Sequence, residues 1–412
     1  MKPDITLIFP NSPFLLDSGV FPPLGIMYLS AYLKKHDVKV QCLDMGLGHK
    51  KEDAKANIVG ISITTPQRQD AFKLADYYDS QGKVVLAGGP HATHMPKECI
   101  LNGFDRVFEG YAEETLCKYL TKTFTPDDVN LFDGGARIYR SCKFDLDKLP
   151  YPDRDALPIK DYKYTIDGTP ATVLMTSRGC PYKCSFCAKI DNNFHLHSAE
   201  YTLGEIEELN SKYGYEAFMI FDDVFITDKN RLRIISDALR FKKYKFRCFA
   251  RANLISDEVC KLLYQMGVVE VGIGVESGSN KILKNNLKNT SRYMNTMAVA
   301  KLHKYGIRAK AFLIVGLPGE NLATIDETHS WVLEARPDDV DISVFQPLPG
   351  SSVFANPEKF DVSFKYNGKS NWFKGTPGKY QASVSTRELS PEQILSFRDK
   401  LEKIHKNQEF LR

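Results

Sequence analysis

Three cysteines stand close together near the middle of the chain, at Cys180, Cys184 and Cys187. Their C-x3-C-x2-C spacing lets one short loop present three thiolates to a single metal centre. A structural zinc site takes four ligands, whereas a four-iron cube bound by three thiolates leaves one iron for a ligand from elsewhere. The spacing therefore favours an iron–sulfur cluster over zinc or over three core cysteines. The other cysteines are scattered singly and are expected to be core or surface residues: Cys42, Cys99, Cys117, Cys142, Cys248 and Cys260.

Length and composition set the frame for these cysteines. A chain of 412 residues predicts two or three domains, and 43% hydrophobic with 26% charged residues is ordinary for a soluble globular protein. A net charge of +4 gives no general sign of nucleic-acid binding. No apolar run approaches the ~20 residues of a membrane span. An odd number of cysteines, and first residues unlike a signal peptide, predict a protein of the reducing cytoplasm.

Residues 1–125 alternate between short apolar strands and helices. Such alternation predicts a doubly wound, parallel α/β domain of the flavodoxin or Rossmann type. Small residues and turns cluster at the expected strand ends, where ligands bind in open sheets of this kind. Strands are expected at Ile5–Phe9, Val38–Leu43, Ile58–Ile63, Val84–Ala87 and Arg106–Phe108, and helices at Leu24–Lys35, Gln67–Tyr78 and Glu113–Thr121.

The stretch 126–171 is expected to be a linker, because Asp, Pro and Gly become frequent there. Gly134 and Gly135 between apolar residues predict a small hairpin over 132–139. Three prolines within 149–158 predict an extended, semi-rigid strap.

Residues 172–349 contain six strand–helix units, which predicts an open, partial (β/α)6 barrel similar to part of a TIM barrel. The expected strands are Val173–Thr176, Ala217–Phe221, Phe246–Ala250, Val268–Gly274, Ala309–Val315 and Val340–Phe345. The helices are expected to begin near Leu203, Lys229, Ser256, Lys281 and Thr324, the fourth continuing through 295–304.

Residues 350–412 form a C-terminal extension to the barrel. Ser390, followed by a proline and three positions later by Gln393, predicts a capped helix that runs to about Gln408. The aromatic residues of the extension are expected either to cover the barrel mouth or to pack on the barrel exterior: Tyr366, Trp372, Phe373 and Tyr380.

Polar residues and glycines follow the expected barrel strands, at the ends where function gathers in such barrels. Asp222 and Asp223 follow the second strand, where the alternative is a helix cap. Arg251 ends the third strand, and a fixed guanidinium there suits a carboxylate. Glu276 ends the fourth and Gly316 the fifth. For these last three residues the alternative is an ordinary strand-end ion pair or turn, and no residue can be named as a substrate acid or base.

The cysteine loop and these strand ends, in this order, resemble the radical S-adenosylmethionine (SAM) superfamily. The resemblance implies a [4Fe–4S] cluster on the three cysteines, whose fourth iron chelates SAM and whose electron cleaves SAM to a 5′-deoxyadenosyl radical. In the family the Asp-Asp segment receives the methionine end of SAM, the glutamate binds the ribose hydroxyls, and the glycine lets adenine approach the backbone. The implied SAM-binding residues are Phe186, Asp222, Asp223, Arg251, Glu276, Ser277 and Gly316.

The N-terminal part resembles the cobalamin-binding domain fused to many radical SAM enzymes, through Phe21-Pro-Pro-Leu-Gly-Ile-Met-Tyr-Leu29, Val59-Gly-Ile-Ser62, Ala87-Gly-Gly-Pro-His91 and Glu109-Gly110. The implied cobalamin-binding residues are Pro22, Pro23, Leu24, Gly25, Ser62, Thr64, Thr65, Gly88, Gly89, Pro90, His91 and Gly110.

The usual Asp-x-His-x-x-Gly segment, whose histidine binds cobalt, is absent, because Asp44 is followed by Met-Gly-Leu-Gly-His49. Cobalt is therefore expected without a protein ligand below it. The alternatives are a ligand among His49, His91 and His94, or a fold that has lost cobalamin.

The resemblance implies an oxygen-sensitive radical SAM enzyme that methylates an unactivated carbon. In that scheme the radical abstracts a substrate hydrogen, methylcobalamin delivers the methyl group, and a second SAM restores it. The alternatives are a non-methylating rearrangement, ring contraction, cyclisation or oxidation, with or without cobalamin, and a non-catalytic iron–sulfur or cobalamin sensor. The expected partners are a small-molecule or biosynthetic-intermediate substrate and an electron donor such as flavodoxin or ferredoxin, with no membrane and no strong nucleic-acid signal.

Overall fold

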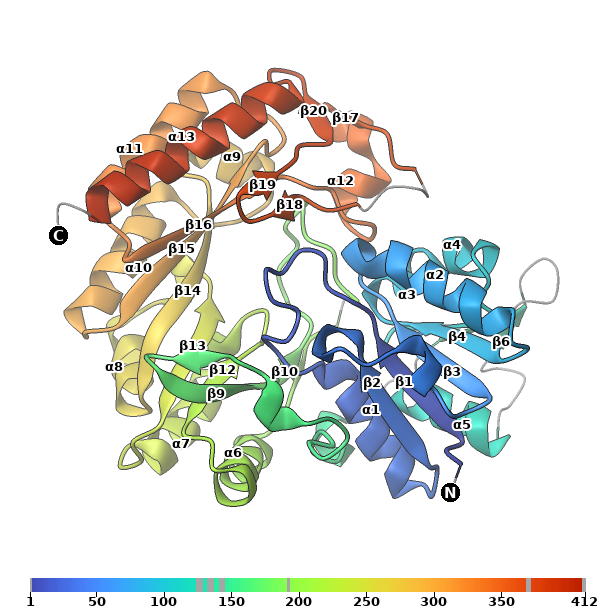
Figure 1. Ribbon diagram of the computed structural model, residues 1–412. Coiled ribbons are helices and arrows are strands. Elements are labelled where there is room, and N and C mark those ends of the chain that lie inside the picture. The colour runs from blue at the N-terminus through green and yellow to red at the C-terminus, as the bar shows by residue number, and fades with distance from the viewer. Residues whose placement is uncertain are drawn as a thin grey trace. The chain divides into compact units, whose positions relative to one another are not determined.

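The chain folds into two compact units in a computed structural model that describes residues 2–123, 129–131, 137–140, 145–190, 193–367 and 372–409. The first unit consists of the described residues of Met1–Lys163, Lys189–Asp191 and Tyr366–Pro377. The second consists of those of Tyr164–Ala188, Asn192–Lys365 and Gly378–Arg412. The elements of each unit are labelled in Figure 1.

The first unit is built on one sheet with the strand order β2-β1-β3-β4-β5-β7-β6. The first six strands in this order run parallel, and β6 pairs antiparallel with β7. The residues that join β6 to β7, where the Gly134–Gly135 turn is expected, lie outside the described residues. The strands are β1 (Ile5–Phe9), β2 (Val40–Asp44), β3 (Ile58–Ser62), β4 (Val84–Gly88), β5 (Arg106–Glu109), β6 (Val129–Leu131) and β7 (Arg137–Arg140).

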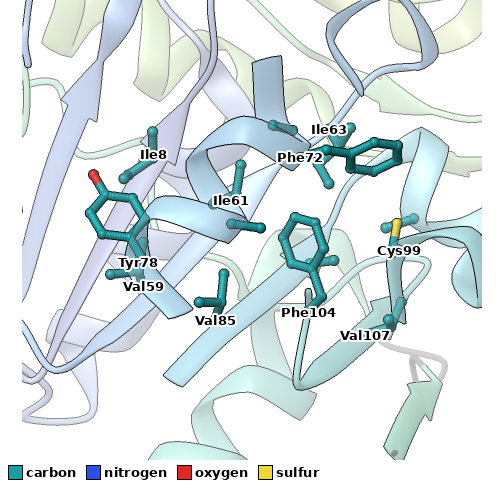
Figure 2. Packing of buried hydrophobic residues seen from close by; sticks show 14 of the residues in the cluster. Ile8, Val59, Ile61, Ile63, Phe72, Tyr78, Val85, Cys99, Phe104 and Val107 are labelled. Atoms are coloured by element: carbon teal, nitrogen blue, oxygen red, sulfur yellow. The ribbon is translucent and has the colours of Figure 1, made fainter. Parts of the chain in front are cut away.

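Helices cover the faces of this sheet, as expected for parallel strands that are apolar on both sides. Phe72 and Tyr78 of α2 pack over the strand residues Val59, Ile61 and Val85 in the main core of the unit (Figure 2). The doubly wound fold predicted from the sequence is confirmed. The helices are α1 (Leu24–Lys35), α2 (Arg68–Asp79), α3 (Pro90–His94), α4 (Pro96–Leu101) and α5 (Glu113–Thr121), with short 3-10 turns at Met45–Leu47, Lys51–Asp53 and Thr65–Gln67.

A segment of the C-terminal extension belongs to the first unit. The Tyr366 hydroxyl donates a hydrogen bond to Glu98 Oε2 (2.6 Å), and Arg68 donates one to the carbonyl of Asn367 (2.8 Å). Trp372 is buried and meets Tyr366 edge-on. The expectation that these two aromatic residues pack on the barrel is therefore wrong. The sequence reveals their apolar character but not which core receives them.

The second unit is built on a curved sheet with the order β16-β15-β14-β13-β12-β9-β8. The strands β9 to β16 of this sheet run parallel, and only the edge strand β8 is antiparallel. Six parallel strands in an open sheet confirm the predicted partial barrel. The strands are β8 (Thr165–Ile166), β9 (Thr169–Leu174), β12 (Ala217–Ile220), β13 (Lys245–Ala250), β14 (Val268–Glu276), β15 (Arg308–Val315) and β16 (Asp339–Val344).

Helices lie along the outer side of this sheet (Figure 1), and most begin at a side-chain cap. Ser198, Asp228, Ser256 and Ser291 each accept a hydrogen bond from a backbone N–H of the first helical turn. The helix expected to begin near Leu203 begins four residues earlier, because Ser198 caps it. The helices are α6 (Ala199–Tyr213), α7 (Lys229–Leu239), α8 (Asp257–Gln265), α9 (Asn280–Asn285), α10 (Arg292–Lys304) and α11 (Leu322–Ala335).

The fourth crossover is broken into two helices, α9 and α10, where one continuous helix was expected. Leu287 and Asn289 both have φ of +53°, which an α-helix does not allow. Asn286 and Lys288, in the same short segment, are almost fully buried. Tertiary contacts of these two polar residues therefore override the local helical tendency.

The extension of the second unit ends in α13 (Pro391–Glu409), which packs beside α11 and against β16 (Figure 1). The predicted cap is present, since Ser390 and Gln393 exchange hydrogen bonds between side chain and backbone. Before it lie α12 (Ser352–Ala355), a 3-10 turn (Pro357–Phe360), β17 (Val362–Phe364), β19 (Lys379–Tyr380) and β20 (Val384–Thr386), while β18 (Gly375–Thr376) falls in the segment that belongs to the first unit. Within the described residues, no helix has the length and apolar character that crossing a membrane requires.

Glu320, in the turn after β15, is a fully buried carboxyl that accepts a hydrogen bond from the N–H of Gly316 (2.6 Å). Burial raises the pKa of Glu320 to about 8. Between about pH 4.5 and about pH 8, the folded protein therefore keeps a proton on Glu320 that the unfolded chain has released. The free energy of unfolding should fall as the pH rises from about 4.5 towards about 8.

We predict that Glu320→Gln removes this part of the pH dependence, because an amide does not titrate and can still accept the Gly316 hydrogen bond. Denaturant unfolding between pH 5 and pH 9 (roughly the range between the two pKa values) measures the effect. The control is Glu388→Gln, at an exposed position. Parallel curves for the wild type and the Glu320 variant would contradict the prediction.

Candidate active site

The three cysteines lie in a loop that leaves the sheet after β9, at the carboxyl end of the first barrel strand. The loop starts with β10 (Ser177–Arg178) and returns with β11 (His195–Leu196), and these two short strands pair antiparallel. Cys180 and Cys184 are partly exposed and Cys187 is exposed. Phe186, between the last two cysteines, is half-buried. The loop thus presents three reduced thiols from a closed stem.

Asp222 fixes the start of this loop from the neighbouring strand end. Its carboxylate accepts hydrogen bonds from the Thr176 N–H and hydroxyl (both 2.6 Å) and from the Ser177 N–H (3.1 Å). Arg231 donates to the Thr176 carbonyl (3.2 Å). Burial raises the pKa of Asp222, while the hydrogen bonds from Thr176 and the charge of Arg231 act in the opposite direction. In this structure both carboxylate oxygens hold the loop.

The expected roles of the Asp-Asp pair are thereby separated. Asp222 is buried, whereas Asp223 is exposed at the next position. The alternative of a helix cap belongs to neither residue, since Asp228 caps α7 by accepting from the N–H groups of Asn230 and Arg231. Asp223 is consequently the carboxylate of the pair that a ligand can reach.

Arg251, at the end of β13, contacts the cysteine loop directly. Its Nη1 lies 3.3 Å from the Cys184 sulfur, and its guanidinium carbon lies 3.7 Å from the centroid of the Tyr182 ring. Its Nη2 donates to the carbonyl of Lys288. Arg251 is almost fully buried, so its guanidinium places a positive charge directly against the cysteine loop. Arg251 therefore supports the chemistry expected of the loop.

Glu276, at the end of β14, pairs with a lysine that the sequence did not single out. Its carboxylate lies 2.6 Å from Lys288 Nζ, and both side chains are largely buried. The ion-pair alternative for Glu276 is thus realised in this structure. Only the bend between α9 and α10 brings Lys288 to the strand end, so no local sequence signal could have found this partner.

Glycines make room for the side chains that lie over β14. A Cβ on Gly274 would meet Glu276 Oε1 at 2.5 Å and Lys288 Nζ at 2.7 Å. A Cβ on Gly272 would meet the rings of Phe312 at 2.6 Å and Phe249 at 2.8 Å. The two glycines therefore admit, on neighbouring positions of one strand face, an aromatic pair and the buried ion pair.

Two further predicted SAM residues, Ser277 and Gly316, contact other elements of the second unit in this structure. Ser277 is buried and its hydroxyl lies 3.1 Å from that of Thr328 on α11. Gly316 has φ of +94°, and a Cβ there would meet Ile394 of α13 at 2.9 Å. The space that Gly316 leaves open on its Cβ side is thus taken by the C-terminal helix.

The residues predicted to bind cobalamin gather at one edge of the first sheet. Ser62, Thr64 and Thr65 end or follow β3, Gly88 to His91 end or follow β4, and Gly110 follows β5. These three strands are adjacent and parallel, so their carboxyl ends share an edge. Pro22 and Pro23 precede α1, whose first residues are Leu24 and Gly25. Gly89 has φ of +91°, and a Cβ there would meet the Ile63 backbone at 2.9 Å.

His91 is fully buried inside this edge. Its Nδ1 lies 3.3 Å from the Thr65 hydroxyl and its Nε2 lies 3.5 Å from Glu98. Burial, with the charges of Arg68 and His94, lowers the pKa of His91 to about 3, so the imidazole is neutral. His49 directs Nδ1 at the Asp44 backbone carbonyl (2.9 Å). His91 is therefore not presented as a ready ligand, whereas His49 is half-buried and engaged only through Nδ1 in these contacts.

The second unit, then, has the form of a half-barrel enzyme with a metal-binding type of loop, and the first has the form of a ligand-binding α/β domain. Residues 174–332 match the family model of the radical SAM superfamily, and residues 17–120 match that of the B12 binding domain. The chain therefore contains a radical SAM domain and, before it, a B12-binding domain, as the sequence resemblance implied.

Named relatives extend over most of the chain. It is 29% identical to an uncharacterized methyltransferase of Pyrococcus horikoshii, over 81% of this chain and 78% of the relative. It is 24% identical to the cytidylyl-2-hydroxyethylphosphonate methyltransferase of Streptomyces wedmorensis, over 80% of this chain and 77% of that protein. It is also 25% identical to the anaerobic magnesium-protoporphyrin IX monomethyl ester cyclase of Cereibacter sphaeroides, over 85% of this chain but only 63% of the cyclase.

Solved structures share the fold. The cobalamin-dependent SAM radical enzyme OxsB, with aqua-cobalamin and SAM bound, matches with a TM-score of 0.77 and 20% identity, over 98% of this chain and 66% of that chain. The radical SAM methyltransferase TsrM of Kitasatospora setae, with cobalamin and a [4Fe–4S] cluster bound, matches with a TM-score of 0.71 and 14% identity, over 88% and 77% of the two chains.

A radical SAM domain implies a [4Fe–4S] cluster and SAM, and a B12-binding domain implies cobalamin. The chemistry of the donor set fits the cluster, since one loop carries three reduced thiols and a guanidinium lies against one of them. Across the described residues, no three His, Cys, Asp or Glu side chains already converge as a metal site, so this fit rests on the donor set alone. An added Cβ at Gly88 would meet nothing within 4 Å, and this open space at the strand end fits part of a bulky ligand.

We predict that replacing Cys180, Cys184 or Cys187 by Ala abolishes cluster binding, because these thiols are the whole protein contribution to the expected site. Iron content and visible absorption of the reconstituted protein should fall to background, and SAM cleavage with them. The matched control is Cys260→Ala, a buried cysteine on α8 in the same unit, which should keep its iron. A triad variant with full iron content would exclude that cysteine as a ligand.

We predict that cobalt bound by the first unit has no histidine ligand, because His91 is buried between Thr65 and Glu98. Electron paramagnetic resonance of the protein loaded with cob(II)alamin should show no nitrogen superhyperfine splitting from a protein ligand. The comparison is the same spectrum from His49→Ala and His94→Ala. Splitting that disappears in either variant would identify that histidine as the ligand and refute the prediction.

Proposed function

We propose that this enzyme methylates an unactivated carbon of a small molecule in a cobalamin-dependent reaction. The observation that carries the proposal is the union of a radical SAM domain and a B12-binding domain in one chain. Support comes from two relatives that are named methyltransferases and that this chain matches over most of their length. When bound, the cluster with SAM would supply hydrogen-abstracting radical chemistry, and cobalamin would supply methyl transfer.

The chain's own residues would hold these groups in place. Cys180, Cys184 and Cys187 would bind the cluster, and Arg251 would keep a positive charge beside the loop. Asp222 would fix the loop stem rather than bind SAM. On this proposal SAM contacts the exposed carboxylate of Asp223. Glu276 would give up part of its bond to Lys288 and bind the ribose hydroxyls instead.

The remaining expectations stay proposals of the same kind. An electron donor such as flavodoxin or ferredoxin would reduce the cluster. The eight described cysteines are all thiols, which agrees with a reducing compartment such as the cytoplasm. The substrate itself would be a small molecule, and no residue is assigned as the acid or base that acts on it.

A second candidate is a radical SAM reaction that does not methylate. It is favoured by the similarity to the monomethyl ester cyclase and to the 4′-phospho-dehydrooxetanocin synthase of Priestia megaterium, whose names state no methylation. The synthase is 25% identical over 78% of this chain, but this chain spans only 50% of it. Methylation remains the first proposal because the relatives spanned more fully are methyltransferases.

SAM carrying a deuterated methyl group separates the two candidates. The reconstituted protein is incubated under anaerobic conditions with this SAM, a reductant and a small-molecule extract, and products are followed by mass spectrometry. We predict a product that carries the label, together with 5′-deoxyadenosine, and neither from Cys184→Ala. 5′-Deoxyadenosine with an altered but unlabelled product would favour the second candidate, and no 5′-deoxyadenosine would refute both.

A further inference from the structure

Asn286 connects the cysteine loop to the loops expected to hold SAM. It is 1% exposed and lies directly after α9, in the bend that the sequence did not predict. Its side-chain oxygen accepts from the Ser185 hydroxyl (3.2 Å), and its backbone carbonyl accepts from the Ser185 N–H (3.1 Å). Ser185 is fully buried and stands between Cys184 and Cys187. Asn286 therefore holds the centre of the cysteine loop through two hydrogen bonds.

The amide nitrogen of the same side chain reaches the opposite side. Nδ2 donates to the carbonyl of Pro318 (3.0 Å), in the turn between Gly316 and Glu320, and to that of Ile282 (3.0 Å). An asparagine amide has two N–H donors and one carbonyl acceptor. Both donors and the acceptor of Asn286 are therefore used, and only another amide side chain carries the same set.

The bend that carries Asn286 also carries the other site contacts. Two residues later, Lys288 pairs with Glu276 through its ammonium group and accepts from Arg251 through its carbonyl. Three strand ends and the cysteine loop therefore meet on a segment of three residues. Displacement of this segment would change the position of the cysteine loop relative to the strand-end residues.

We propose that Asn286 is a positioning residue that holds the cysteine loop and the SAM-side loops in one fixed arrangement, so that SAM reaches the cluster only when the bend is intact. The inference rests on the radical SAM character of the barrel and not on the methylation proposed above. Removing the buried amide takes away the partner of the Ser185 hydroxyl and of the Pro318 carbonyl, and the loops relax apart. Small misplacements between reacting groups have large effects on catalysis.

The test uses the full chain with reconstituted cluster and compares Asn286→Ala, Asn286→Asp and Ser185→Ala. We expect iron content to stay near that of the wild type, because no cysteine is changed. The Kd for SAM should rise roughly tenfold in Asn286→Ala, the scale of one or two lost hydrogen bonds. The change that SAM causes in the electron paramagnetic resonance spectrum of the reduced cluster should shrink or broaden. Asn286→Asp, which keeps the acceptor, should lie between.

Asn295→Ala is the matched control, because Asn295 is equally buried in the same unit and its amide reaches only the carbonyl of Val275, at 3.5 Å. It reports the general cost of removing a buried asparagine. Unfolding stability should fall in both alanine variants, whereas SAM affinity and the spectral response should change only in Asn286→Ala. Equal SAM affinity in the two variants would overturn the inference.

A double-mutant cycle makes the assignment specific. If Asn286 acts through the cysteine loop, Ser185→Ala weakens SAM binding in the wild-type background and has no further effect in Asn286→Ala. Additive effects on the Kd would overturn the inference. Should Asn286→Ala fail to fold, Ser185→Ala alone decides, since it keeps the backbone bond and removes only one hydroxyl. The proposed function is tested separately: wild-type protein that binds SAM normally but transfers no methyl group would refute that function and not this inference.

Discussion

The buried carboxylate of Asp222 is the interaction on which the site depends. It lies at the end of β12 and holds two consecutive backbone N–H groups and one hydroxyl at the start of the cysteine loop. Burying a carboxylate costs several kcal/mol, and hydrogen bonds to a charged group return about 1.5–3 kcal/mol each. Three such bonds, with Arg231 close by, are what the burial requires. The loop stem is consequently fixed before any cofactor binds.

Beyond this anchor the loop contacts one side chain from the end of β13 and one from the bend after α9. Arg251 meets Cys184 and Tyr182, and Asn286 meets Ser185. The loop is therefore held at its stem by the Asp222 carboxylate and at its centre by the Asn286 acceptors and the Arg251 guanidinium. A cysteine loop held in this way can present thiols outward without collapsing on the sheet.

In both units, glycines let other groups of the chain pack closely against the backbone. In the second unit, glycines on β14 admit large side chains over the strand face. In the first, Gly89 lets the turn after β4 pack against the Ile63 backbone, and His91 lies in a buried cluster with Glu98, Arg68 and Tyr366. That cluster is completed by a segment more than 250 residues away in the chain, since 366 is 268 residues beyond 98. This buried cluster of the α/β domain is therefore completed by a residue of the C-terminal extension.

The sequence by itself determined the classes of structure and the chemistry. Periodic apolar runs defined most strands to within two residues, and Ser390 with Gln393 placed α13 correctly, because strand burial and helix caps are local properties. The spacing of Cys180, Cys184 and Cys187 identified the reaction class for the same reason: three ligands in one loop need no tertiary contact to be recognised.

Only the tertiary structure decided which polar residues meet. The sequence resemblance assigned Asp222 to SAM binding, but packing places Thr176 against both of its oxygens. The sequence predicted one helix where Asn286 and Lys288 instead form a buried bend. It assigned Tyr366 to the barrel, whereas Glu98 and Arg68 bind it in the first unit. Each of these outcomes depends on a partner distant in the chain, and a buried polar group takes whichever partner the fold brings within hydrogen-bonding distance.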